Sequence, residues 1–236
     1  MKKIFLSALL FVMLISMSVE KAEAQCASGD VLFGFIFHYV VPNSNPEKSC
    51  DYLIKYCLHC EPSGNATTGT LVSIEIAPGQ LNDCMGYALN PSNDPYNPFD
   101  FEVKLSEAIK SEALNHCYLP PCDGHTYKPM EVRVPVCLKV VNYALPNNQH
   151  NMVLEFCPGE AYCVQYYNCC WDNSQTPAWF KCAFLGKAII GQINCTIPYP
   201  NPSNLDILLP PGKTWNDNWV NPPVECFYNS GNTCQQ

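Results

Sequence analysis

The chain has 236 residues, with 21 Asp and Glu against 13 Lys and Arg, so its formal net charge is −8 at neutral pH. Arg133 is the only arginine, and binding to nucleic acid needs a basic surface that this composition excludes. The same charge balance disfavours adhesion to an anionic membrane.

The first 24 residues have the parts of a cleaved secretory signal peptide. Lys2 and Lys3 give a positive start, residues 4–19 are apolar apart from three serines, and Ala22-Glu23-Ala24 is a signal-peptidase pattern. The apolar run is shorter than the roughly 20 residues of a spanning helix, and no later stretch is long enough. We therefore predict a mature chain, residues 25–236, without a membrane span. An uncleaved anchor and a lipid anchor at Cys26 are the alternatives.

Strands are the main elements that the sequence predicts. Residues 31–41 are rich in Val, Phe, Ile and Tyr, which predicts a largely buried strand. Residues 71–77 and 131–140 alternate between apolar and polar, and Pro135 indicates an edge or a bulge in the second of these strands. Residues 152–156 and 162–167 are weaker candidates.

One segment, residues 104–117, has the spacing of an amphipathic helix. Its apolar residues recur close to an i, i+3, i+4 stripe, and its outward face is expected to carry Lys104, Glu107, Lys110 and Ser111. Together with the strands, this helix predicts a β-rich fold, in the range from all-β to α+β.

The 16 cysteines all follow residue 24, and this density behind an export signal is typical of a disulfide framework formed in an oxidising compartment. We therefore predict a secreted or extracytoplasmic protein of the periplasm, the cell surface or the extracellular space. The cysteines expected in disulfides are Cys26, Cys50, Cys57, Cys60, Cys84, Cys117, Cys122, Cys137, Cys157, Cys163, Cys169, Cys170, Cys182, Cys195, Cys226 and Cys234.

An internal repeat is indicated by the order of motifs. Residues 90–93 and 201–204 both read Asn-Pro-Ser-Asn, and each follows a cysteine after five residues. Six cysteines in each half keep the same order at similar offsets. The sequence therefore predicts two tandem sandwich-like repeats stapled by disulfides, residues 25–128 and 129–236, with the helix in the first. Coincidence in a chain rich in Asn, Pro and Cys is the alternative.

The remaining cysteines leave the pairing open. Cys157 and Cys182 are candidates for an extra bridge in the second half, whereas Cys26 and Cys137 are either equivalent or partners of each other. Cys169 and its neighbour Cys170 should bridge to different partners, because adjacent residues of a strand point to opposite faces.

Cys57-Leu58-His59-Cys60 resembles the active tetrapeptide of thioredoxin-fold oxidases, and the resemblance covers only these four residues. Residues 61–65 have the composition of a turn where that fold has a helix. Structural disulfides are therefore the preferred interpretation. A thiol oxidoreductase at Cys57 and Cys60, and a zinc site formed by Cys57, His59, Cys60, Cys117, Cys122 and His125, are the alternatives.

No set of residues for hydrolysis stands out. The serines lack a GxSxG motif, and His38 lies inside an apolar strand. The acidic residues Glu75, Glu102, Glu131 and Glu155 lie on strand-like segments with nothing to show that two of them converge, as a glycosidase would need. A secreted enzyme, hydrolase or oxidoreductase, stays the alternative to a non-enzymatic protein.

Calcium is the one cofactor for which the sequence offers ligands. Asp172-Asn173, and Asp94 with Asn90 and Asn93, are hard oxygen donors, although the EF-hand spacing is missing. Such clusters are more often turn residues, so the sequence assigns no metal ligand.

The aromatic residues give the only binding hypothesis. Trp171 and Trp179 belong to an aromatic, cysteine-rich stretch, and Trp215 and Trp219 lie in a polar stretch that favours exposure. Exposed aromatic side chains are common anchors for partners, whereas packing over the disulfides is the structural alternative. We therefore predict a structural or binding protein, such as an adhesive or cell-surface module, whose partner is an extracellular protein or a glycan. An inhibitor or toxin-like effector is a third hypothesis.

Overall fold

The computed structural model describes residues 26–41, 47–61, 65–76, 84, 100–157, 161–174, 179–198, 208–223, 226–228 and 234. The expected signal peptide lies outside these residues, as do Asn90, Asn93 and Asp94. No helix in the described part is long and apolar enough to cross a membrane.

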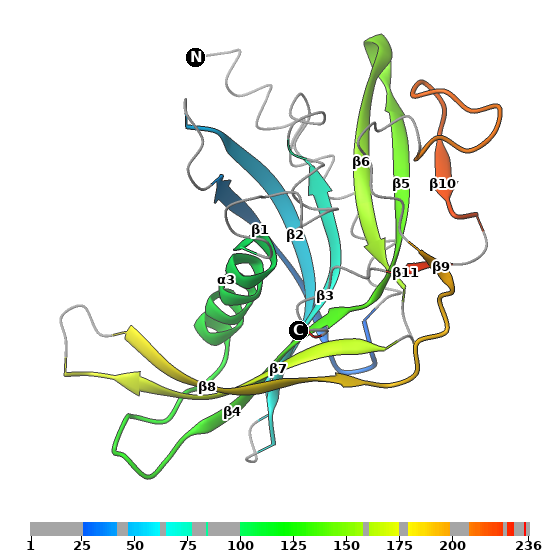
Figure 1. Cartoon of the computed structure of the whole chain (residues 1–236). Helices are drawn as coiled ribbons and strands as arrows, with labels where there is room; N and C mark the ends of the chain where they lie inside the picture. Colours follow the sequence, from blue (N-terminus) through cyan, green and yellow to red (C-terminus); the bar gives the residue numbers. More distant parts are fainter. Residues whose placement is uncertain are drawn as a thin grey trace, which may run out of the picture.

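The described residues form one large mixed sheet and one long helix (Figure 1). This confirms the prediction of a β-rich fold with a helix. The elements are β1 (Val31–Val40), β2 (Ser49–His59), β3 (Thr67–Ile76), α3 (Asp100–His116), β4 (Lys128–Pro135), β5 (Cys137–Leu145), the 3₁₀ turn η3 (Pro146–Asn148), β6 (Gln149–Phe156), β7 (Tyr162–Asp172), β8 (Trp179–Ile190), β9 (Ile197–Pro198), β10 (Trp219–Asn221) and β11 (Phe227–Tyr228).

The sheet forks at β3. One edge of β3 pairs with β2, which in turn pairs with β1. The other edge pairs first with β4, in parallel, over residues 67–70, and then with β6, antiparallel, over residues 73–75. One limb therefore continues from β4 to β7 and β8, and the other continues from β6 to β5 and the short strands β10 and β11.

Pro135 divides the strand that the sequence predicts over residues 131–140. The proline ends β4, and the chain then enters β5 at Cys137, on the other limb of the sheet. The amide of Val136, between the two strands, donates to the carbonyl of Ala161 instead of continuing the ladder. The alternation of residue types runs through the break because both strands bury one face.

The core lies between α3 and the sheet. α3 packs against β1, β3 and β4 (Figure 1), with Leu105, Ile109 and Ala113 fully buried. Lys110, expected on the outward face, is instead buried, because the limb of β4 and β7 covers that side of the helix. Its ammonium contacts Glu107 and lies 4.4 Å from the ring centroid of Tyr167.

β1 is less buried than its composition predicts. It pairs only with β2 among the described strands, so one edge and one face of it are open. Phe37 and Tyr39 face the core, whereas Ile36 and His38 are exposed. His38 bonds across the pair to Asp51, with 2.6 Å between Nδ1 and Oδ1.

Eight disulfides pair all sixteen cysteines, and none is free, which confirms the predicted framework. The pairs are Cys26–Cys57, Cys50–Cys84, Cys60–Cys117, Cys122–Cys170, Cys137–Cys195, Cys157–Cys226, Cys163–Cys234 and Cys169–Cys182. Cys169 and Cys170 do have different partners, as expected. A Cys157–Cys182 bridge and a Cys26–Cys137 bridge are both wrong.

The two-repeat organisation is not confirmed. Strands from residues 25–128 and from residues 129–236 belong to the same sheet, and the bridge Cys122–Cys170 joins the two segments. The bridges also differ between them: Cys50 pairs with Cys84, but Cys163, its counterpart in the proposed repeat, pairs with Cys234. Duplication therefore stays a prediction from the order of motifs.

Candidate binding edge and the His59 clamp

The four tryptophans predicted as a binding set fall into two separate pairs. Trp171 and Trp179 lie at the same end of the β7–β8 hairpin, because the neighbouring residue Asp172 is opposite Trp179 in register. Both are exposed, Trp171 by 37% and Trp179 by 56%. Trp215 and Trp219 lie against each other, with ring centroids 5.5 Å apart.

The second pair is packed into the protein. Trp219 is buried and donates from Nε1 to the carbonyl of Thr214 at 3.2 Å, so its expected exposure is wrong. Trp215 is half-buried and stacks on His150. Asn142 of β5 holds the loop by donating to the carbonyls of Trp215 and Asp217. Because Asn142 is distant in sequence, the local polarity around the tryptophans could not reveal this packing.

β8 is the outermost strand of its limb and pairs only with β7 among the described strands. Figure 1 shows the β7–β8 hairpin, in yellow, reaching beyond the helix. The strand exposes large apolar side chains that we call the β8 edge: Trp179, Phe184, Leu185, Ile189 and Ile190. An edge strand offers unpaired N–H and C=O groups to other chains, and long apolar edges are normally protected.

Both faces of the hairpin contribute to this surface. Phe184 is opposite Tyr167 in register and Trp179 is opposite Asp172, and residues 167 and 172 of β7 point to different faces because they are an odd number of positions apart. The ring of Phe184 lies 5.5 Å from that of Tyr167. The charges on β8 are two lysines, Lys181 and Lys187, without an acidic residue.

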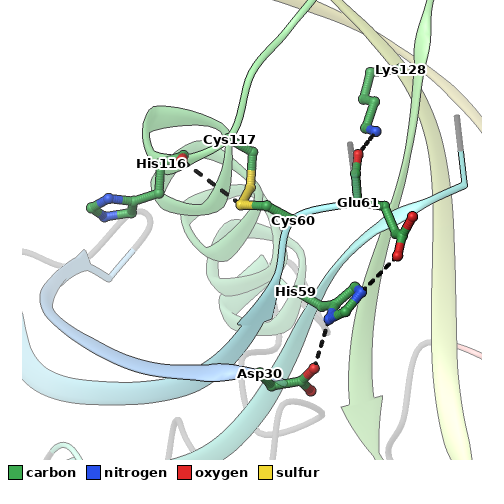
Figure 2. The surroundings of a disulfide bond; sticks show 7 residues. All are labelled: Asp30, His59, Cys60, Glu61, His116, Cys117 and Lys128. Atoms are coloured by element: carbon green, nitrogen blue, oxygen red, sulfur yellow. Dashed lines mark hydrogen bonds and ion pairs between the residues drawn. A yellow bond between two sulfur atoms is a disulfide. The ribbon is translucent and has the colours of Figure 1, made fainter. Parts of the chain in front are cut away.

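The two cysteines of the CxxC segment belong to separate disulfides and not to one redox pair; Figure 2 shows one of them, Cys60–Cys117. Cys57 bridges to Cys26 and Cys60 bridges to Cys117. A thiol oxidoreductase needs Cys57 and Cys60 to form a disulfide with each other, so the prediction of a redox site at these two cysteines is wrong for this arrangement. The same bridges leave no thiolate there for zinc, which binds the deprotonated sulfur.

His59, between these cysteines, is held by two carboxylates (Figure 2). Its Nδ1 lies 3.0 Å from Asp30 Oδ1 and its Nε2 lies 3.1 Å from Glu61 Oε1. Carboxylates only accept hydrogen bonds, so both contacts are satisfied only when both ring nitrogens carry a proton, and the arrangement favours the imidazolium form. The hydrogen bond to Glu61 and the charge of Asp30 raise the pKa of His59. This His59 clamp joins the segment before β1 to the end of β2, where Lys128 also donates to the Glu61 carbonyl.

The clamp should make stability depend on pH in one direction. Because the pKa of His59 is raised in the folded state, its contribution is complete below the unfolded value of about 6.5 and is lost as pH rises through the folded value. The difference in free energy of unfolding between wild type and His59→Gln should therefore shrink as the pH is raised from below about 6.5 to well above it, as measured by urea titration.

His150→Gln serves as the control with the opposite sign. Burial lowers the pKa of His150, so its contribution to stability is lost as pH falls below about 6.5 and its variant should show the reverse trend. An unchanged difference for His59→Gln across the pH range would contradict the clamp.

Other candidate residues are engaged in the sheet or in turns. Glu75 accepts a hydrogen bond from Asn151, and Glu155 accepts one from Tyr143. Burial is the largest cause that raises the pKa of Tyr143 to about 12, and the negative charges of Glu155 and Glu75 add to it. The structure thus brings Glu75 and Glu155 near one tyrosine on adjoining strands, a proximity that the sequence did not indicate.

The calcium candidate Asp172 accepts from both the amide and the hydroxyl of Ser174, as a turn residue does. Nowhere in the described ranges are three or more His, Cys, Asp or Glu side chains placed to hold a metal ion.

No protein-family model, no curated protein and no solved structure matches this chain. The eight disulfides remain the observation that assigns its class: it is a disulfide-rich protein of the kind found outside the cytoplasm.

Proposed function

We propose that this protein is an extracellular binding protein that captures an extended segment of a partner protein along the β8 edge. The observation that carries the proposal is the exposure of Trp179, Phe184 and Leu185, each by more than half, on a strand that pairs only with β7 among the described strands. A strand added there would receive backbone hydrogen bonds and would cover apolar side chains on both faces, as in β-augmentation.

Charge narrows the choice of partner. β8 carries Lys181 and Lys187 and no acidic residue, in a chain whose net charge is −8. A second copy of β8 would bring four lysines together along one ladder, and like charges across strands are destabilising. The favoured partner is therefore an apolar segment that also carries acidic side chains.

The test uses three synthetic ten-residue peptides with the mature, oxidised protein. One alternates Val with Glu, the second alternates Val with Lys, and the third is the Glu peptide with alternate backbone nitrogens methylated. We expect the Glu peptide to bind and to protect β8 amides from hydrogen exchange. The other two should bind about ten-fold more weakly. The Lys peptide loses the attraction to the lysines of β8, and the methylated peptide loses backbone hydrogen bonds.

Variants of the protein locate the site. Leu185→Ser combined with Trp179→Ser should weaken the Glu peptide about ten-fold or more, because two exposed apolar anchors are lost. Lys181→Glu with Lys187→Glu should reverse the preference between the Glu and Lys peptides. Tyr118→Ser, which alters a side chain that is 80% exposed elsewhere, and Lys213→Glu are the matched controls and should leave binding unchanged.

Three outcomes would contradict the proposal. The first is that the variant with both Leu185→Ser and Trp179→Ser still binds the peptide. The second is that sedimentation shows a dimer that this variant abolishes. The third is that the protein binds glycans on an array through Trp179 and does not bind the peptide.

A further inference from the structure

A second feature of the chain, unrelated to the β8 edge, is a pocket of about 580 Å³ over β1 and β2. Its wall is the segment from Cys26 to Asp30, and its floor includes Gly34, Leu53 and Lys55. The wall is fixed at both ends, by the Cys26–Cys57 disulfide and by the bond between Asp30 and His59. The volume lies within the range of about 300–1,000 Å³ that is usual for small-molecule sites.

The pocket lies on the face of the sheet that α3 leaves uncovered. Ile54 packs in the core beneath the helix, and Lys55, the next residue of β2, points to the other face. Gly34 is opposite Lys55 in register, so any side chain at position 34 would project over the same floor.

Lys55 is the cationic residue that lines this pocket, and its ion pair with Glu75 is long. Its side chain is only 11% exposed, and its nearest carboxylate oxygen, Glu75 Oε2, is 4.0 Å from Nζ, at the limit of an ion pair. Glu75 is already the acceptor for Asn151. An ammonium has three donors, so this single long contact leaves it capacity for another acceptor. Lys55 also lines the pocket, where its Cγ would lie 3.9 Å from a Cβ at Gly34.

The glycine keeps the floor open. A Cβ atom at Gly34 would lie 3.5 Å from the Ile54 carbonyl and 3.8 Å from Leu53 Cδ1, which are ordinary contacts, so a larger residue would fit the backbone. Glycine inside a strand weakens it and often marks a close approach of a ligand. At this position the missing side chain leaves room above Lys55.

We propose that this pocket binds a small amphipathic anion, with its apolar body on Leu53 and Leu32 and its anionic group on Lys55 Nζ. The apolar residues supply burial, and the under-coordinated ammonium supplies the preference for a negative head group.

Octanoate is the probe, compared with octanol and octylammonium by saturation-transfer NMR and calorimetry on the mature, oxidised protein. Octanoate should bind most tightly. Lys55→Met should weaken octanoate about ten-fold or more, because a hydrogen bond to a charged group is lost, and should leave octanol unchanged. Lys213→Met is the charge control and should change neither ligand.

Gly34→Val places a side chain over the pocket floor beside Lys55. Because valine favours strands, the variant should unfold at the same or a higher temperature than wild type and should bind all three ligands more weakly. Unchanged octanoate binding in Gly34→Val, an absence of octanoate binding to wild type, or a preference for octylammonium would each overturn the proposal. The β8 peptide assay is unaffected by Gly34→Val, so the two proposals fail independently.

Discussion

Replacing Cys122 and Cys170 together by alanine should lower the free energy of unfolding by about 4 kcal/mol. The bridge closes a loop with a sequence separation of 48, and the chain-entropy relation gives about this value for such a loop. It also secures the segment after α3 to β7, where Cys122 donates to the Trp171 carbonyl and Trp171 donates to the Pro120 carbonyl.

The neighbouring bridge provides the control. Cys169–Cys182 has a sequence separation of only 13, so Cys169→Ala with Cys182→Ala should cost about 3 kcal/mol by the same relation. Cys169 and Cys170 are equally buried, so the cavities left by alanine are similar. Guanidinium titration of both oxidised variants measures the difference. An equal or larger loss for the Cys169–Cys182 variant would contradict the loop-length argument.

Gly69→Ala should destabilise the protein by about 1–3 kcal/mol through overpacking. Gly69 lies on β3 beneath the helix, where an added Cβ would be 3.1 Å from Ile109 Cγ2 and 3.7 Å from the Ala113 Cβ. Ile109 is fully buried, so it has little room to move away.

A double-mutant cycle identifies the contact. Ile109→Ala alone should cost about 2–5 kcal/mol because it leaves a cavity. In the double variant the new methyl group occupies part of that cavity, so the combined loss should be smaller than the sum of the two. Gly34→Ala is the matched control, since its Cβ meets only ordinary contacts, and it should be neutral or stabilising. Additive losses would show that Gly69 and Ile109 do not contact each other.

The parts of the fold that could be predicted from the sequence are those set by neighbouring residues. The helix was expected over residues 104–117 and spans Asp100–His116, because its apolar stripe depends only on local spacing. β2 and β8 were not predicted. β8 is exposed along most of its length, so no buried face imposes an alternation on its sequence.

The features that decide function depend on residues distant in the chain. Lys110 lies outside the apolar stripe of its helix, which predicts an exposed side chain. It is buried because Tyr167, from a strand distant in sequence, packs over it. The His59 clamp requires Asp30, and the pocket requires Gly34 to face Lys55 across β1 and β2. Cysteine pairing is equally non-local, which is why the count of cysteines predicted bridges but not their partners.

The fork at β3 has a consequence for how the protein matures. β3 comes from the first part of the chain, yet the strands on its forked side, β4 and β6, are synthesised later. Cys122 likewise precedes its partner in the chain, because Cys170 follows 48 residues downstream. During synthesis the Cys122 thiol is therefore made before the strand that carries its partner, so a bridge that it forms with an earlier cysteine has to be exchanged before the native pair can form.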